Sequence, residues 1–167
     1  MLTELSKLLK YKAWANNVTF SSLSSVDNEE LYKTRPTNFK NIIQTLNHVY
    51  VVDDIFKSHL LSKNHGYSSR NTQTCPSFKE LWEEQKIIDQ WYVNFINQQD
   101  IKGLNKVIEF EFIGGGNGEM SIIEIVFHVV NHGTYHRGFV SDMMYQIPVK
   151  PQANDLTVFL RDSYKNK

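Results

Sequence analysis

Histidine is the residue type whose arrangement in this 167-residue chain most strongly suggests chemistry, because three of the six histidines lie within nine residues. These three are His128, His132 and His136. Imidazole is the commonest metal ligand in proteins. On a helix, residues four apart are offset by about 6 Å and about 40°, so His132 and His136 can each place a nitrogen at about 2.0–2.1 Å from one divalent ion. His128 and His136 are separated by about 12 Å along the axis, so all three do not bind one ion.

The helix that carries these histidines begins with a capping-box sequence, Ser121-Ile-Ile-Glu124, and is predicted to end at Gln146 or Ile147. At about 100° per residue, His132 and His136 fall within its apolar stripe and His128 at the edge. The stripe consists of Ile122, Ile125, Val129, Phe139, Met143 and Ile147. An unpaired buried polar group costs about 1–3 kcal/mol, so two rings on this stripe need partners. A carbonyl or hydroxyl commonly satisfies one such ring, whereas two rings at this spacing favour a metal ion.

The third metal ligand is expected from another helix, and His48, His59 and His65 are the candidates. His48 is favoured because it lies in a largely apolar turn, whereas His59 has polar neighbours and His65 lies in a Gly- and Ser-rich segment. A set made of His48, His132 and His136 leaves one coordination position for water, which is typical of a catalytic zinc. The ligand type also admits nickel, iron, cobalt and manganese.

Four long helices are expected to position these side chains. The second helix is predicted to begin after Pro36, with Thr37 or Asn38 as its N-cap, and the third to begin at a capping box, Ser77-Phe-Lys-Glu80. The predicted ranges of the first three are residues 2–23, residues 37–63 and residues 77–96.

Two shorter elements complete the predicted fold. Residues 106–113 alternate like a short strand and residues 114–118 read as a turn, which gives an extended excursion or hairpin before the fourth helix. A short last helix is predicted over residues 155–164. The sequence therefore predicts an all-α four-helix bundle with one long crossover, in a single domain of residues 1–167.

Composition excludes several classes of function. Eighteen basic and eighteen acidic residues cancel, so nucleic acid is not an expected partner. No apolar run is long enough to cross a membrane, and the N-terminus lacks the pattern of a secretory leader. The single Cys75 excludes an internal disulfide and has no feature that would make it reactive, so a cytoplasmic location is expected.

Several stretches resemble the DinB family, within the DinB/YfiT-like superfamily of metal-binding bundles. The most specific is Asn131-His-Gly-Thr-Tyr-His-Arg-Gly138, in the fourth predicted helix. Weaker matches are Tyr11-Lys-Ala-Trp-Ala-Asn16, Leu46-Asn-His-Val-Tyr-Val-Val-Asp53, and Pro151 followed by Asp155-Leu-Thr-Val-Phe-Leu160. Together they span nearly the whole chain.

The resemblance implies an up-down-down-up bundle that holds a divalent metal on His48, His132 and His136, with zinc or nickel expected. It also implies a homodimer, which a second apolar strip on the fourth helix would support; this strip consists of Ile122, Val126, Val130, Val140 and Met144. His128 would either orient a ligand or bound water, or be a histidine at the core edge. Arg137 would pair with Asp53, Asp54 or Asp155 across the bundle, or meet an anionic substrate.

The expected function is that of a metal-dependent enzyme acting on a small molecule. Some relatives in the resembled family are thiol S-transferases and others are described as metal-dependent hydrolases. Metal coordination lowers the pKa of a thiol or of water, so activation of a low-molecular-weight thiol is the leading hypothesis and hydrolysis the first alternative. The second alternative is a bundle that binds a metal or small ligand without catalysis.

Overall fold

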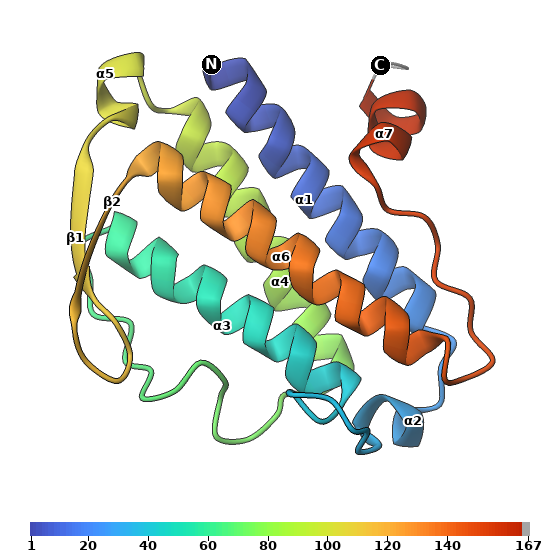
Figure 1. Ribbon diagram of the computed structural model, residues 1–167. Coiled ribbons are helices and arrows are strands. Elements are labelled where there is room, and N and C mark those ends of the chain that lie inside the picture. Colours follow the sequence, from blue (N-terminus) through green and yellow to red (C-terminus); the bar gives the residue numbers. More distant parts are fainter. Residues whose placement is uncertain (165–167) are drawn as a thin grey trace.

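Four long helices form the body of the protein in the computed structural model, which describes residues 1–164. They are α1 (Leu2–Leu23), α3 (Ile42–Leu60), α4 (Phe78–Asn97) and α6 (Ile122–Met144). Helix α1 packs against α4 and α6, and α3 packs against the same two helices from the opposite corner. In Figure 1, α1 and α6 run in one direction and α3 and α4 in the other, which confirms the all-α bundle of up-down-down-up type.

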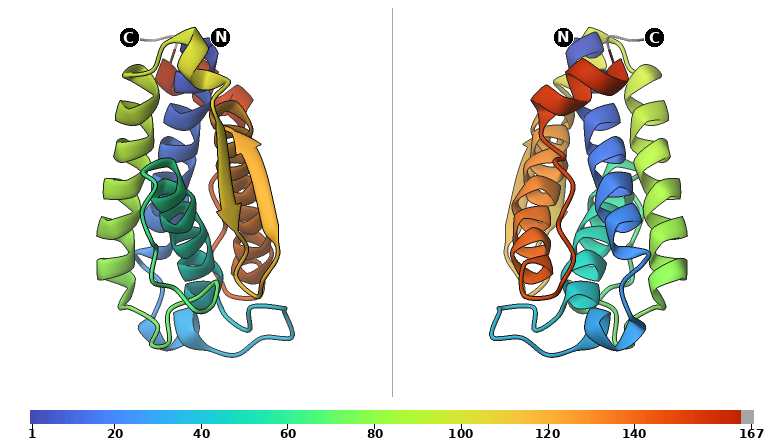
Figure 2. Two further views of the ribbon diagram at one scale, coloured as in Figure 1. Left: turned by 90° about the vertical axis from the view of Figure 1, so that its left-hand side faces the viewer. Right: turned by 90° about the vertical axis from the view of Figure 1, so that its right-hand side faces the viewer.

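A long crossover and a hairpin connect the helices on the side where α3 and α6 meet. Because α3 and α4 are parallel, residues 61–77 return along the length of the bundle (Figure 2). The excursion before α6 is a hairpin of two antiparallel strands, β1 (Val107–Glu111) and β2 (Asn117–Ser121). Its turn contains Gly114, Gly115 and Gly116, all with φ between 94° and 98°, a region that favours glycine. The hairpin packs beside α3 and α6, as Figure 1 shows.

The helix starts show where local sequence patterns were sufficient and where they were not. Both capping boxes are present, at Ser77 for α4 and at Ser121 for α6. The predicted N-cap of α3, Thr37 or Asn38, is wrong, because Asn41 caps this helix by accepting a hydrogen bond from the backbone N–H of Gln44 at 2.8 Å. The preceding residue, Lys40, has a φ of 66°, so the chain turns there and cannot yet be helical.

The helix ends and the short elements differ modestly from expectation. Helix α3 ends at Leu60 and α6 at Met144, each two or three residues before the predicted end. The short C-terminal helix is confirmed as α7 (Leu156–Phe159) followed by a π-helical turn (Leu160–Tyr164). Two further short helices are α2 (Asn28–Tyr32) and α5 (Ile101–Leu104). Within the described residues, no helix is both long enough and apolar enough to span a bilayer.

The inward face of α6 is wider than its sequence suggests. The second apolar strip proposed for a dimer contact lies in the core of the chain itself, where Ile122, Val126, Val130, Val140 and Met144 are all buried. Phe139, which the helical spacing places in the core stripe, is 37% exposed, whereas Arg137 is buried. The buried arc is therefore rotated away from His132 and toward Arg137, because α1 and α3 both pack on α6. His132 consequently lies where α6 borders α3.

Candidate metal centre

Three histidines from two neighbouring helices come together at this border. His48 on α3 and His132 and His136 on α6 each offer one ring nitrogen, and these three atoms lie within 4.8 Å of one another. The ring centroids are 4.4 to 4.9 Å apart. His48 and His136 are buried and His132 is half-buried. The structure thus assembles the residues that the i, i+4 spacing and the second helix indicated, and we call them the histidine triad.

The backbone of the crossover loop fixes the orientation of His48. Its Nδ1 lies 2.7 Å from the carbonyl oxygen of Arg70. A carbonyl only accepts hydrogen bonds, so Nδ1 donates and the lone pair is on Nε2. That Nε2 lies 3.1 Å from Nε2 of His132. Phe39 stacks on the ring of His48, with centroids 4.4 Å apart, and restricts the ring further.

The distance between the two Nε2 atoms fits a shared divalent ion. Nitrogens that bind one ion at about 2.0–2.1 Å in a tetrahedral arrangement lie about 3.3 Å apart. Within residues 1–164, no group outside the triad hydrogen-bonds to the ring of His132 or His136. The buried Nδ1 atoms of both rings have no partner in that part of the chain. These two rings are therefore not held as ordinary hydrogen-bonded core histidines.

The triad is electrically neutral near pH 7. Burial, with a smaller contribution from the other histidines, lowers the pKa of His132 to about 2 and that of His136 to about 4. Burial also lowers the pKa of His48, although the hydrogen bond to Arg70 opposes this. Neutral imidazole is the form that coordinates metals, so no proton has to be removed before the triad could hold a divalent ion.

A cavity of about 630 Å³ opens onto the triad and gives room for a small molecule. The crossover loop and α6 supply most of its remaining walls, with Asn38, Phe39, Ser69, Arg70, Asn71, Tyr135 and Phe139. None of these lining residues is a carboxylate or a cysteine, so the cavity brings no fourth protein ligand of those types to the triad. The arrangement is that of an open site rather than a closed structural one.

The remaining histidines lie outside the triad. His128 stacks on His132 with centroids 5.5 Å apart and contacts Phe56 at 4.6 Å, without a hydrogen bond to the triad. His128 thus lies at the core edge and forms no hydrogen bond with a triad ring within residues 1–164, while a role in orienting a bound ligand or water stays a prediction. His59 stacks on Phe110, and His65 contacts His59.

Two contributors to the site were not foreseen from the sequence. Phe39 precedes α3 in an irregular segment, and Arg70 acts on His48 through its backbone carbonyl. A backbone carbonyl leaves no signal in residue types. Asn47 is a partial sequence signal for this loop. Its fully buried amide donates to Asn71 and Thr72 and so holds the loop beside the triad.

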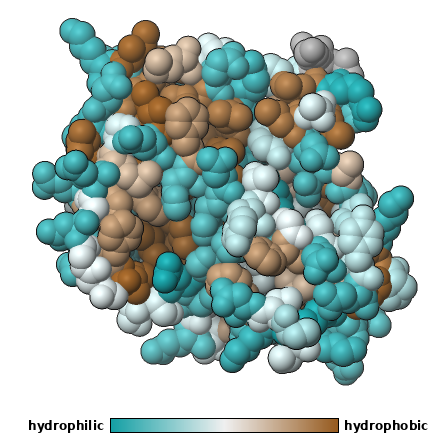
Figure 3. Space-filling model, in the orientation of Figure 1, coloured by the Kyte–Doolittle hydropathy of each residue, from teal (hydrophilic) through white to brown (hydrophobic). Residues whose placement is uncertain are grey.

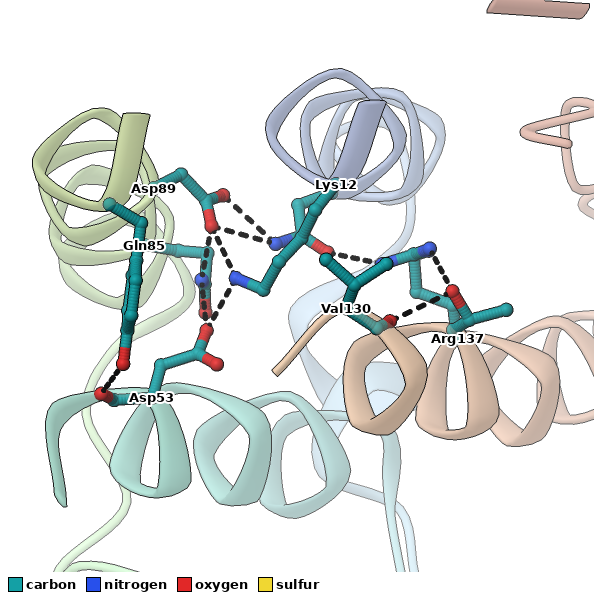
Figure 4. Close-up of polar contacts among 9 residues, drawn as sticks. Lys12, Asp53, Gln85, Asp89, Val130 and Arg137 are labelled. Atoms are coloured by element: carbon teal, nitrogen blue, oxygen red, sulfur yellow. Dashed lines mark hydrogen bonds and ion pairs between the residues drawn. The ribbon is translucent and has the colours of Figure 1, made fainter. Parts of the chain in front are cut away.

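A second group of polar residues lies among the four helices, and we call it the lysine cluster: Lys12, Asn16, Asp53, Gln85 and Asp89. Figure 4 shows Lys12 between the two carboxylates, and its Nζ lies 2.6 Å from Asp53 and 2.5 Å from Asp89. Arg137 does not form the predicted ion pair with Asp53, Asp54 or Asp155; it donates instead to Asn16 and to the hydroxyl of Thr134, each at 2.9 Å. The sequence prediction missed this cluster because its members are far apart in the chain.

The fold and the histidine triad together define a class of protein: a four-helix bundle with a three-histidine group, able to hold a metal ion, at an open cavity. The chain belongs to the DinB family, whose model matches residues 1–166. It is 28% identical over 161 residues to Protein DinB of Bacillus subtilis (strain 168), and the match covers 92% of each chain. A crystal structure of a DinB-like protein from Bacillus cereus ATCC 10987 shares the fold, with a TM-score of 0.59 at 18% identity. That match covers 87% of this chain and 94% of the other.

Proposed function

We propose that this protein is a divalent-metal-dependent enzyme that activates a small-molecule thiol at the histidine triad, as a thiol S-transferase does. The observation that carries the proposal is the meeting of three neutral ring nitrogens within 4.8 Å at the wall of an open cavity. A bundle that needed a metal only as a structural link would be expected to surround it with four protein ligands.

The residues of the chain hold and orient the reacting groups. His48 is fixed by the Arg70 carbonyl and by Phe39, while His132 and His136 are fixed by their positions on one face of α6. A divalent ion, when bound, would supply a positive charge that lowers the pKa of a thiol or water placed against it. Three neutral rings do not cancel that charge, so the site favours an anionic reactant.

We propose zinc or nickel as the metal, because soft thiolate ligands bind these ions better than they bind hard metal ions. Iron, cobalt and manganese are also compatible with three imidazole ligands. Among the residues that line the 630 Å³ cavity there is no Asp or Glu to act as a general base toward water, and Glu111 lines only a smaller cavity that adjoins the triad. That favours thiol transfer over hydrolysis. Cys75 lies outside this cavity, and burial raises the pKa of its thiol, so the reacting thiol is an external one.

We also propose that the protein acts as a cytoplasmic homodimer. With the second strip of α6 buried in the chain's own core, the apolar residues left for a contact are others, including Phe127, Tyr135 and Phe139, which are 37–64% exposed on α6. Light scattering at micromolar concentration should give twice the 19.5 kDa mass of the chain. A mass near that of one chain contradicts this part of the proposal.

Spectroscopy of the cobalt-substituted protein tests the proposed chemistry. A low-molecular-weight thiol should produce a sulfur-to-cobalt charge-transfer band, and the protein should accelerate conjugation of that thiol to a small electrophile. His132→Ala should lose both effects, while His65→Ala, a histidine outside the triad, should keep them. Turnover of an ester or amide without any response to thiols would support hydrolysis. A fully metal-loaded protein that does neither would be a binding bundle.

A further inference from the structure

A second, smaller cavity adjoins the triad on the side of the hairpin. Its volume is about 150 Å³, and it lies between α3, α6 and β1. His48, Arg70 and His132 line both this cavity and the larger one, so the two meet at the triad. We call the smaller one the hairpin pocket. Figure 3 shows hydrophobic surface gathered at the left, over the hairpin and the adjoining helices.

Apolar and aromatic side chains form most of the wall of the hairpin pocket. Val52, Ile55 and Phe56 come from α3 and are at most 8% exposed. Phe110 comes from β1, and Phe112 follows it at the open edge with 53% exposure. Glu111 is the one carboxylate among the lining residues. Because successive side chains of a strand point to opposite faces, Glu111 alternates with its neighbours Phe110 and Phe112 along the chain.

Ring contacts run without a break from the hairpin to the triad. Phe112 meets Phe110 edge to face at 5.1 Å, and Phe110 meets Phe56 at 5.5 Å. Phe56 contacts His128, which in turn stacks on His132. A flat apolar group in this pocket would therefore lie against ring faces and edges and end beside a triad histidine.

A glycine on the opposite strand makes room for this aromatic wall. Gly118 pairs with Phe110 across the hairpin. A Cβ built there would lie 2.7 Å from the ring of Phe110 and 2.9 Å from that of Phe112, distances that real Cβ atoms do not show. The absence of a side chain lets both rings lie across β2, so the sequence of the hairpin is matched to the pocket it borders.

Resting on the proposed function, we propose that the hairpin pocket binds a compact apolar group of the substrate, next to its reacting centre. A cavity of about 150 Å³ has room for a molecule of the size of benzene, and apolar or aromatic side chains form most of the wall of this one. The substrate class is thus a small molecule that carries a phenyl-sized or short branched apolar group on one side of the reacting atom. Its polar part faces the larger cavity.

Two metal-binding probes that differ only in their apolar group test this assignment. Acetohydroxamate and benzohydroxamate share the chelating end, and their affinities for the zinc-loaded protein are compared by calorimetry. We expect benzohydroxamate to bind at least about tenfold more tightly, since its ring leaves water. Phe112→Ala removes an exposed wall and should reduce this ratio several-fold. Ile87→Ala, which removes a similarly exposed apolar side chain of α4 outside both cavities, should leave the ratio unchanged.

Nuclear Overhauser contacts locate the ring of the probe. Contacts from the phenyl protons to Ile55 and Phe110 support the proposal, whereas contacts to Tyr135 and Phe139 overturn it by placing the ring in the larger cavity. A ratio near one, or a ratio that Phe112→Ala does not change, also overturns it. In either case zinc-dependent binding of acetohydroxamate would leave the proposed function standing.

Failure of the metal site itself gives a different pattern. If neither hydroxamate binds in a zinc-dependent way, the proposed function fails, and benzyl alcohol added to the metal-free protein then tests the pocket alone. Shifts of the Val52 and Ile55 methyl resonances that weaken in Phe112→Ala would support the pocket. No shift at saturating benzyl alcohol would overturn it.

Discussion

The lysine cluster, on α1, α3 and α4, and the histidine triad, on α3 and α6, are both groups of polar side chains within one bundle, yet their polar atoms are satisfied differently. In the lysine cluster, a buried ammonium lies within 2.6 Å of two carboxylates, and side-chain amides donate to the same two carboxylates. In the triad, Nε2 of His132 lies 3.1 Å from Nε2 of His48, and the buried Nδ1 atoms of His132 and His136 have no partner within residues 1–164. Within residues 1–164, nearly all buried polar side-chain atoms of the lysine cluster have hydrogen-bond partners, whereas the buried Nδ1 atoms of His132 and His136 have none.

The two groups also differ in the charge of their side chains. Burial lowers the pKa of Lys12, but Asp53 and Asp89 outweigh it and the net shift is upward, so Lys12 stays charged. The pKa values of the triad histidines are all lowered, so those rings stay neutral. A buried group whose partners are present acts in stability, whereas one whose nitrogens lack partners is available to a ligand from outside. The comparison predicts that mutations in the two groups will have opposite consequences for stability and metal binding.

The largest expected effect is on metal binding by triad variants. His132→Ala and His136→Ala should each abolish stoichiometric binding, and His48→Ala should do nearly as much damage. Each loss should exceed the roughly 10–100-fold that removal of a ligand's outer partner costs. Metal content after dialysis and titration calorimetry measure it. The ligand assignment is wrong if His65→Ala costs as much affinity as His132→Ala.

Lys12→Met should show the opposite behaviour, with a loss of stability and an intact metal site. Removing the ammonium leaves two buried carboxylates without their cation, which costs about 3–5 kcal/mol of unfolding free energy. Denaturant unfolding of the metal-free protein measures the loss. Lys7→Met, which breaks an exposed ion pair with Glu4, is the matched control and should leave the midpoint nearly unchanged. An unchanged midpoint in Lys12→Met would show that the cluster is not structural.

Acidification should destabilise the metal-free protein through the triad. Below pH 6.5 the unfolded chain protonates its histidines, while native His132 and His136 remain neutral to about pH 2 and 4. The unfolded state then binds more protons, so stability decreases as the pH falls, by up to about 4 kcal/mol between pH 7 and 5 for the two rings.

Comparison with a variant isolates this effect from the lysine cluster. Burial, against the opposing effect of Lys12, raises the pKa of Asp53, which contributes with the opposite sign. The double variant His132→Ala/His136→Ala retains that contribution and should show a smaller acid-dependent fall, since burial also lowers the pKa values of His48, His59 and His128. If its stability falls between pH 7 and 5 as steeply as that of the native protein, the lowered pKa values are not the cause.

The smallest expected effect concerns the loop that holds His48. Asn47→Ala removes the hydrogen bonds to Asn71 and Thr72 and frees the loop that presents the Arg70 carbonyl. Metal affinity should fall about tenfold. Asn94→Ala, at a surface position on α4, is the control. Equal affinities in both variants would mean that the loop does not position His48.

Local patterns were enough to predict much of the fold and the members of the triad. The two capping boxes fixed the starts of α4 and α6, and the i, i+4 spacing placed His132 and His136 together. The apolar turn around His48 distinguished it from His59 and His65. Each of these features depends on residues close in sequence, where helix geometry alone decides the outcome.

Features that depend on distant contacts were predicted less well. The buried arc of α6 could not be separated into a core stripe and a dimer strip, because its width depends on how α1 and α3 both pack on it. Asn41 was missed as the N-cap of α3 because the turn at Lys40 has no clear sequence signal. The Arg70 carbonyl reaches His48 only because the crossover returns past α3.

A metal-edge X-ray absorption spectrum of the purified protein, taken with its elemental analysis, tests the central claim most directly. We predict one divalent ion per chain, with three imidazole nitrogens at about 2.0–2.1 Å, no protein sulfur and at least one exchangeable light ligand. Addition of a low-molecular-weight thiol should introduce one sulfur neighbour. Fewer than two imidazoles on the ion, or a protein that takes up no metal in stoichiometric amount, would contradict the account.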